Sequence, residues 1–113
     1  MARVVVLGDV FGLVARRTEL LELFDDTQAL ARREPGCLAY SFAEVVGEPG
    51  HFLIAQVWRD AAALETHYRS ESFAVYQHRV GELLARPSDV EVHHVSETLH
   101  PEETGPMDPR RAD

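Results

Sequence analysis

The sequence predicts an α+β fold of the ferredoxin-like class, an antiparallel sheet with the element order β-α-β-β-α-β. Three observations predict it. Four short segments rich in Val, Leu, Ile and aromatic residues read as strands, two amphipathic segments read as helices, and a Gly/Pro turn joins the second strand to the third as a hairpin. Right-handed crossovers then place both helices on one face of the sheet. A chain of 113 residues fits one such domain.

The first strand and helix occupy the opening third of the chain. Residues 3–10 are rich in Val and Leu without helical spacing, which is typical of a mostly buried strand. The following helix repeats apolar or small side chains at helical spacing, so that one face carries Leu20, Leu23, Phe24, Thr27 and Ala31. Pro35-Gly36 is expected to end it.

Residues 37–46 and 51–59 form the predicted hairpin. The first of these strands contributes Leu38, Tyr40, Phe42 and Val45. Strict alternation in the second places Phe52, Ile54, Gln56 and Trp58 on one face, with His51, Leu53, Ala55 and Val57 on the other. The turn between them is Gly47-Glu48-Pro49-Gly50.

The second helical region begins after Asp60, a good N-cap residue, and has an expected break at Ser70-Glu71-Ser72. Beyond the break, one helix face is predicted to carry Phe73, Tyr76, Gln77, Val80 and Leu84, and Pro87 is expected to end the helix. Residues 89–97 are the fourth predicted strand. We therefore expect a domain over residues 1–99 and a C-terminal tail over residues 100–113, which has little to bury.

The sheet face away from the helices needs a cover, because the first three strands are apolar on both sides. A second copy of the same sheet supplies that cover by two-fold symmetry, so we predict a homodimer.

Charge and composition limit the partners. Acidic residues outnumber basic ones by 19 to 11, giving a net charge of −8, which disfavours nucleic acid and anionic membranes. No apolar run approaches the length of a membrane span. The single cysteine, Cys37, cannot form an internal disulfide, which fits a reducing compartment, and we expect a cytoplasmic protein.

Three segments together resemble the antibiotic biosynthesis monooxygenase family over about residues 3–97. They are Glu34-Pro35-Gly36-Cys37-Leu38-Ala39-Tyr40, then Val57-Trp58-Arg59-Asp60 followed by Ala62-Ala63-Leu64-Glu65-Thr66-His67, and finally Ser72-Phe73. The resemblance implies a dimeric α+β barrel with a pocket in each subunit between sheet and helices. It also implies oxidation of a phenolic, quinol or polyketide-like aromatic molecule by O2, with no metal or organic cofactor.

Trp58 and His67 are the candidate catalytic residues. Trp58 is either a ring-stacking wall of the pocket or a core aromatic that anchors the following helix. His67 is either a base or hydrogen-bond donor to a phenolate, or a structural histidine bonded to backbone or a carboxylate.

The candidate substrate-binding residues are mostly aromatic or polar side chains expected near the pocket: Tyr40, Tyr76, Phe24, Phe73, Gln77, Asp9 and His93. Plain packing is the alternative for the two tyrosines. Haem-degrading relatives carry a histidine ligand at the position of Gln77, so haem degradation is disfavoured. Other oxygenase members carry an asparagine where this chain has Ile54, and Asp9 and His93 are candidates to supply polarity instead.

No metal site is expected, because His93 and His94 point to opposite faces of a strand. Three functions remain open: a cofactor-independent monooxygenase, a non-oxidative cyclase, isomerase or lyase on the same scaffold, and a ligand-binding barrel protein without catalysis. Persistence of turnover without O2 separates the first two.

Overall fold

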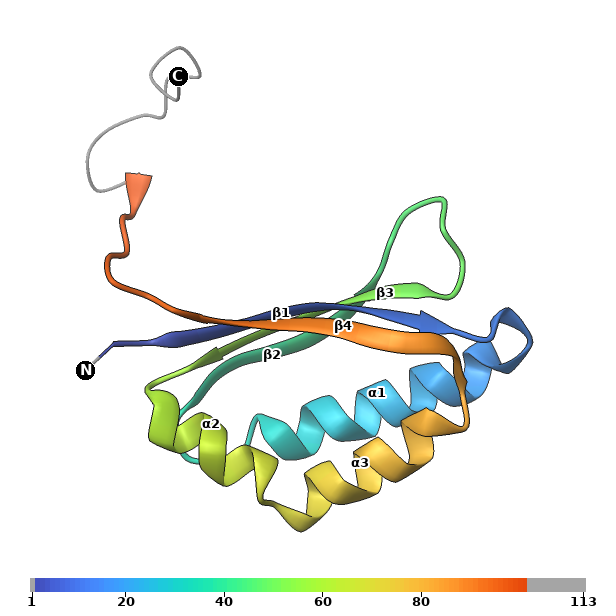
Figure 1. The fold of residues 1–113 in the computed structure, drawn as a ribbon, viewed down its shortest axis with the longest axis horizontal. Helices are drawn as coiled ribbons and strands as arrows, with labels where there is room; N and C mark the ends of the chain where they lie inside the picture. The colour runs from blue at the N-terminus through green and yellow to red at the C-terminus, as the bar shows by residue number, and fades with distance from the viewer. Residues whose placement is uncertain (1, 102–113) are drawn as a thin grey trace.

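A computed structural model of the chain describes residues 2–101 and confirms the ferredoxin-like α+β prediction (Figure 1). The elements follow in the order β1 (Val4–Gly12), a 3-10 turn η1 (Val14–Arg16), α1 (Arg17–Ala31), β2 (Cys37–Glu44), β3 (His51–Trp58), α2 (Ala61–Tyr68), α3 (Glu71–Gly81) and β4 (Leu84–His94). All neighbouring strands pair antiparallel in the order β2-β3-β1-β4. The three helices lie on one face of the sheet.

The predicted alternation of β3 is confirmed. Phe52, Ile54, Gln56 and Trp58 are buried on the helix side, while Leu53 is 45% exposed on the other side. The register carries this pattern to β1, where Val6 pairs with Gln56 and Val4 with Trp58. Both β1 residues are buried. The two central strands therefore present one continuous inner face to the helices.

Helix α1 packs on the sheet through the predicted stripe. Leu20, Leu23, Phe24 and Ala31 are buried, and Thr27 is partly buried with its hydroxyl donating to the Leu23 carbonyl oxygen at 2.7 Å. This face forms because the apolar side chains recur every three to four residues.

Side chains cap α2 and α3, at Asp60 as predicted and at Ser70, the first residue of the predicted break. The Asp60 carboxylate accepts from the Ala63 N–H at 2.9 Å, and the Ser70 hydroxyl accepts from the Phe73 N–H at 3.2 Å. Each cap satisfies a backbone donor that the first helical turn leaves unpaired. The chain therefore breaks between Tyr68 and Glu71, as the sequence predicts, and turns α3 away from α2.

The predicted end of the last helix is wrong. Helix α3 ends at Gly81, and β4 begins at Leu84 and runs through Pro87. A proline is tolerated because β4 is an edge strand, and because the pairing with β1 shifts register between Arg86 and Asp89. Leu84 therefore belongs to the sheet, and the strand expected over residues 89–97 starts earlier and ends at His94.

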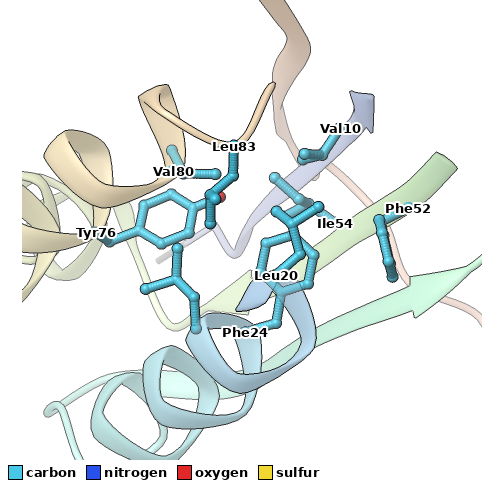
Figure 2. Close-up of a cluster of buried hydrophobic side chains, with 9 residues drawn as sticks. Val10, Leu20, Phe24, Phe52, Ile54, Tyr76, Val80 and Leu83 are labelled. Carbon is cyan, nitrogen blue, oxygen red and sulfur yellow. The ribbon is translucent and has the colours of Figure 1, made fainter. Parts of the chain in front are cut away.

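The buried side chains form two clusters along the inner face. The larger cluster contains Val10, Leu20, Phe24, Phe52, Ile54, Tyr76, Val80 and Leu83 (Figure 2). These side chains converge from β1, β3, α1, α3 and the short connection after α3. The smaller cluster gathers around Trp58 and includes Tyr40 and Leu64. It lies where α2 meets the sheet.

Within residues 2–101, no element covers the sheet face opposite the helices (Figure 1). Leu7 on β1 and Leu53 on β3 are 48% and 45% exposed there. Within residues 2–101, no helix is long and apolar enough to cross a membrane. Most of the predicted tail, residues 102–113, lies outside the described part of the chain.

Candidate functional site

A cavity of about 550 Å³ lies between the inner face of the sheet and helices α2 and α3. None of its lining residues carries a charged side chain. Most are aromatic or aliphatic, and the polar ones bear only hydroxyl or amide groups. They are Val6, Tyr40, Ile54, Gln56, Tyr68, Phe73, Tyr76, Gln77, Val80, Leu84, Ser88 and Val90. Such a cavity suits a neutral, largely apolar small molecule with a few polar atoms.

Gln56 is the polar residue of the inner face of β3, and only 4% of it is exposed. The Trp58 Nε1–H donates to its Oε1 at 2.9 Å. Trp58 itself is fully buried and does not line the cavity, so the structure places this candidate catalytic residue behind the wall, in contact with a residue that does line it. Gln56 was not among the residues predicted for the site. A polar side chain at an inward position of an otherwise apolar alternation was the available signal.

Tyr40 and Tyr76 come from opposite walls, β2 and α3, and both line the cavity. Burial raises the pKa of each phenol above its ordinary value, and for Tyr40 the neighbouring Tyr76 adds to the shift. Both hydroxyls therefore stay protonated at neutral pH and are able to donate hydrogen bonds.

His67 lies on the inner side of α2 and is 2% exposed. Its Nδ1 is 2.6 Å from the Glu34 Oε2. A carboxylate only accepts, so Nδ1 carries a proton, and in the neutral ring Nε2 presents its lone pair. Nε2 is buried and has no hydrogen-bond partner in the described part of the chain. A carboxylate that orients an imidazole in this way is a common arrangement for a general base.

The turn after α1 brings Glu34 to His67. Gly36 has a φ of +84°, and a Cβ at this position would lie 2.5 Å from the Ala63 Cβ on α2. A glycine is therefore required both by the backbone conformation and by the close approach of α2. Glu34 belongs to a segment that carries the family resemblance, but sequence alone did not reveal it as the partner of His67, 33 positions away.

A second hollow, a groove of about 340 Å³ between α1 and α3, is lined by His67. His67 does not line the main cavity, but its ring packs against four aromatic neighbours. The centroid distances are 4.7 Å to Trp58, 5.0 Å to Phe73, 5.5 Å to Tyr40 and 5.8 Å to Tyr68. Phe73 and Tyr76 line both the cavity and the groove, so their rings form the partition between the two.

The other candidates on the helices fall into two groups, those that line the cavity and one that lies in the apolar core. Phe73 and Gln77 line the cavity, as expected. Phe24 lies in the apolar core, where its ring stacks on Phe42 at 4.0 Å and meets Phe52 edge-on at 4.9 Å. The neighbour of Gln77, His78, has an 83% exposed side chain and points to solvent.

The structure does not bring Asp9 and His93 to the cavity. Asp9 pairs in register with Leu53 and His93 with Val5, which places both on the outer face of the sheet. The Asp9 Oδ1 lies 2.7 Å from the His51 Nε2, and this hydrogen bond raises the pKa of His51, with a further contribution from Glu48. In their place, Gln56 and Ser88 add polar groups to the cavity wall, and neither was predicted for the site. Across residues 2–101, no group of three or more His, Cys, Asp or Glu side chains is arranged to hold a metal ion.

Three curated relatives share sequence with the chain. An uncharacterized protein of Synechocystis, sll1783, is 33% identical over 95 residues, which are 84% of this chain and 65% of that protein. The chain thus spans just under two thirds of that relative's length. "Putative monooxygenase YcnE" of Bacillus subtilis is 33% identical over 61% of this chain and 76% of its own. "Putative monooxygenase Rv0793" of Mycobacterium tuberculosis is 34% identical over 67% of this chain and 74% of its own.

Solved structures share the fold. The structure of Rv0793 superposes with a TM-score of 0.79 and 28% identity, covering 87% of this chain and 99% of that one. A "putative antibiotic biosynthesis monooxygenase" of Deinococcus radiodurans has a TM-score of 0.81 at 24% identity, covering 86% of this chain and 96% of that one. The family model described as "Antibiotic biosynthesis monooxygenase" matches residues 14–79, more than half of the chain. The chain therefore belongs to the antibiotic biosynthesis monooxygenase family.

Proposed function

We propose that the protein is a cofactor-independent monooxygenase that oxidises an aromatic small molecule of the phenol, quinol or polyketide-like class with O2. The observation that carries this proposal is the neutral, aromatic-lined cavity of about 550 Å³, whose polar groups are hydroxyls and amides. The family membership and the names of two relatives support it.

The proposed oxidation proceeds through the anion of the substrate, because the electron-rich anion is the species that passes an electron to O2. For an anthrone-like substrate, loss of a C–H proton gives an enolate, and the protonated Tyr40 and Tyr76 hydroxyls would stabilise its oxygen. The electron-rich anion passes one electron to O2, and the resulting radical and superoxide combine to form a C–O bond. The hydroperoxide then loses water to leave a ketone, so that one CH2 and one O2 become one C=O and one H2O. The substrate itself is the reductant.

His67 is the proposed base. Glu34 holds its Nδ1, and the buried Nε2 has no partner among the described residues. Because Phe73 and Tyr76 form the partition in front of it, proton transfer from a substrate in the cavity requires one of these rings to move aside. The aromatic wall would also keep bulk water from the anion.

The test is O2 consumption with a panel of anthrones, naphthols and quinols, with no metal or flavin added. The wild-type protein should yield a quinone or hydroxylated product. His67→Ala should lower kcat by about 10²–10⁴-fold, the usual contribution of a general base. His78→Ala is the matched control, because His78 is a solvent-exposed helix histidine, and its rate should be unchanged. Equal melting temperatures would separate loss of the base from loss of the fold.

A panel without turnover would overturn the proposal, and turnover that persists without O2 would identify a cyclase, isomerase or lyase instead. One observation favours ligand binding without catalysis as the second candidate: the residues that line the cavity include no histidine and no charged side chain. In that case the same aromatic compounds would bind, and His67→Ala would alter affinity without any rate to lose.

We also propose that the protein works as a homodimer through the outer face of the sheet. Leu7 and Leu53 are each about half exposed at neighbouring positions of β1 and β3, beside Ala55, which pairs with Leu7. An isologous pairing would bury this patch twice. Because each leucine is already about half buried, completing its burial would contribute about 0.7–1.5 kcal/mol.

A further inference from the structure

We infer that the Gln56 amide is the donor that selects an aromatic ligand for its carbonyl or phenolate oxygen, and that Trp58 is the positioning residue that turns this amide toward the cavity. The inference rests on the proposed function only for the choice of an aromatic ligand. Gln56 contacts the ligand, and Trp58 acts only by holding the Gln56 amide in position.

The hydrogen bond to Trp58 determines which end of the amide faces the cavity. An indole N–H is only a donor, so the atom 2.9 Å from it is the amide oxygen, and the opposite end of the amide is the NH2 group. Gln56 lines the cavity, and its NH2 makes no hydrogen bond to any residue within 2–101. The amide therefore presents a donor to the cavity.

The residues around this donor further limit the class of ligand that fits the cavity. Tyr40 pairs with Gln56 across β2 and β3, also lines the cavity, and keeps its hydroxyl protonated through burial, so the neighbouring strand offers the cavity a second donor. Ile54 and Val6 flank them with apolar surface. A ring system with an oxygen acceptor at one edge matches this wall. A carboxylate or phosphate would lose its hydration without meeting a cation, because no lining residue is charged.

A pair of probes that differ in one group tests the inference. The compounds 9-fluorenone and fluorene share the same planar rings, but fluorenone has a carbonyl where fluorene has a CH2. Equilibrium dialysis should show that the wild-type protein binds fluorenone about tenfold more tightly, as one satisfied buried hydrogen bond predicts. Gln56→Leu should remove this preference and leave fluorene binding intact. Fluorenone is already oxidised, so its binding is measured apart from any turnover.

Matched variants separate the donor from simple packing. Ile54→Ala removes apolar contact from the same wall, so it should weaken both probes equally and keep the tenfold ratio. Trp58→Phe keeps a ring but loses the N–H, which frees the amide to rotate, and the ratio should fall between those of the wild-type protein and Gln56→Leu. Gln56→Glu offers only oxygen atoms to the cavity and should lose the preference as well.

An unchanged ratio in Gln56→Leu, an equal loss of both probes in that variant, or no binding of either probe to the wild-type protein would overturn the inference. A full ratio in Trp58→Phe would overturn the positioning role. The proposed oxidation fails separately. If fluorenone binds in a Gln56-dependent way but no reduced substrate consumes O2, the inference stands and the oxidation does not. If Gln56→Leu oxidises substrate with unchanged KM, the oxidation stands and the inference does not.

Discussion

The inner face of the sheet packs against three helices, whereas no element in the described part of the chain, residues 2–101, covers the outer face of the same strands (Figure 1). On the helix side of the sheet, Gln56 and His67 are buried, and each has one polar atom held by a specific partner. On the outer face, polar groups such as Asp9 and His51 pair at the margin of an exposed apolar patch. The inner face therefore determines stability and ligand binding, and the outer face is suited to association.

The largest expected effect is a loss of stability on the inner face. Phe24→Ala removes a ring that is 3% exposed, stacks on Phe42 and meets Phe52 edge-on, so the free energy of unfolding should fall by about 3–5 kcal/mol. Urea denaturation measures this value. Leu21→Ala, on the solvent-exposed side of the same helix, is the control and should lower the free energy of unfolding by no more than about 0.5 kcal/mol. Similar losses in the two variants would break the contrast between packed and exposed positions.

The next effect should appear on the outer face, as a change in assembly. Leu53→Lys places a charge in the exposed patch of both copies, and the dimer Kd should rise by at least about a hundredfold while the circular dichroism spectrum is retained. Sedimentation velocity measures the association. Leu21→Lys makes the same change on the helix layer and should leave the assembly as it is in the wild-type protein. A monomeric wild-type protein would refute the dimer outright.

The smallest effect should be a pH dependence confined to the margin of the outer face. Hydrogen bonding to Asp9, and secondarily to Glu48, raises the pKa of His51 above its ordinary value of 6.5. Its contribution to stability is therefore fully present below pH 6.5 and is lost as the pH rises through the raised pKa. Stability measured across this window should fall with pH in the wild-type protein and less steeply in His51→Gln. Asp9→Asn should flatten the same window, and an equal slope in all three proteins would exclude the linkage.

Local patterns in the sequence were sufficient for most of the fold. Local spacing is enough to predict the apolar stripe of α1 and the caps at Asp60 and Ser70, because helix faces and caps depend on residues close in sequence. The end of α3 was not. Leu84 continues the helical pattern of the sequence and Pro87 is a typical helix end, but pairing of Leu84 and Arg86 with β1 places this stretch in the sheet.

The candidate site was predictable in part. Tyr40, Tyr76, Phe73 and Gln77 line the cavity as expected, because the inward faces of strand and helix follow from periodicity. The places of Trp58 and Phe24 were decided by depth, since both point inward but lie behind the wall rather than on it. Periodicity gives the direction of a side chain and leaves its distance from a cavity open.

By itself, the sequence determined the order of strands and helices and which residues face inward, because these depend on spacing along the chain. Only the tertiary structure decided which polar groups meet: Glu34 with His67, and Asp9 with His51. These partners lie 33 and 42 positions apart. Their contacts depend on the position that each element takes relative to the others when the apolar side chains pack. Spacing along the chain does not determine that position.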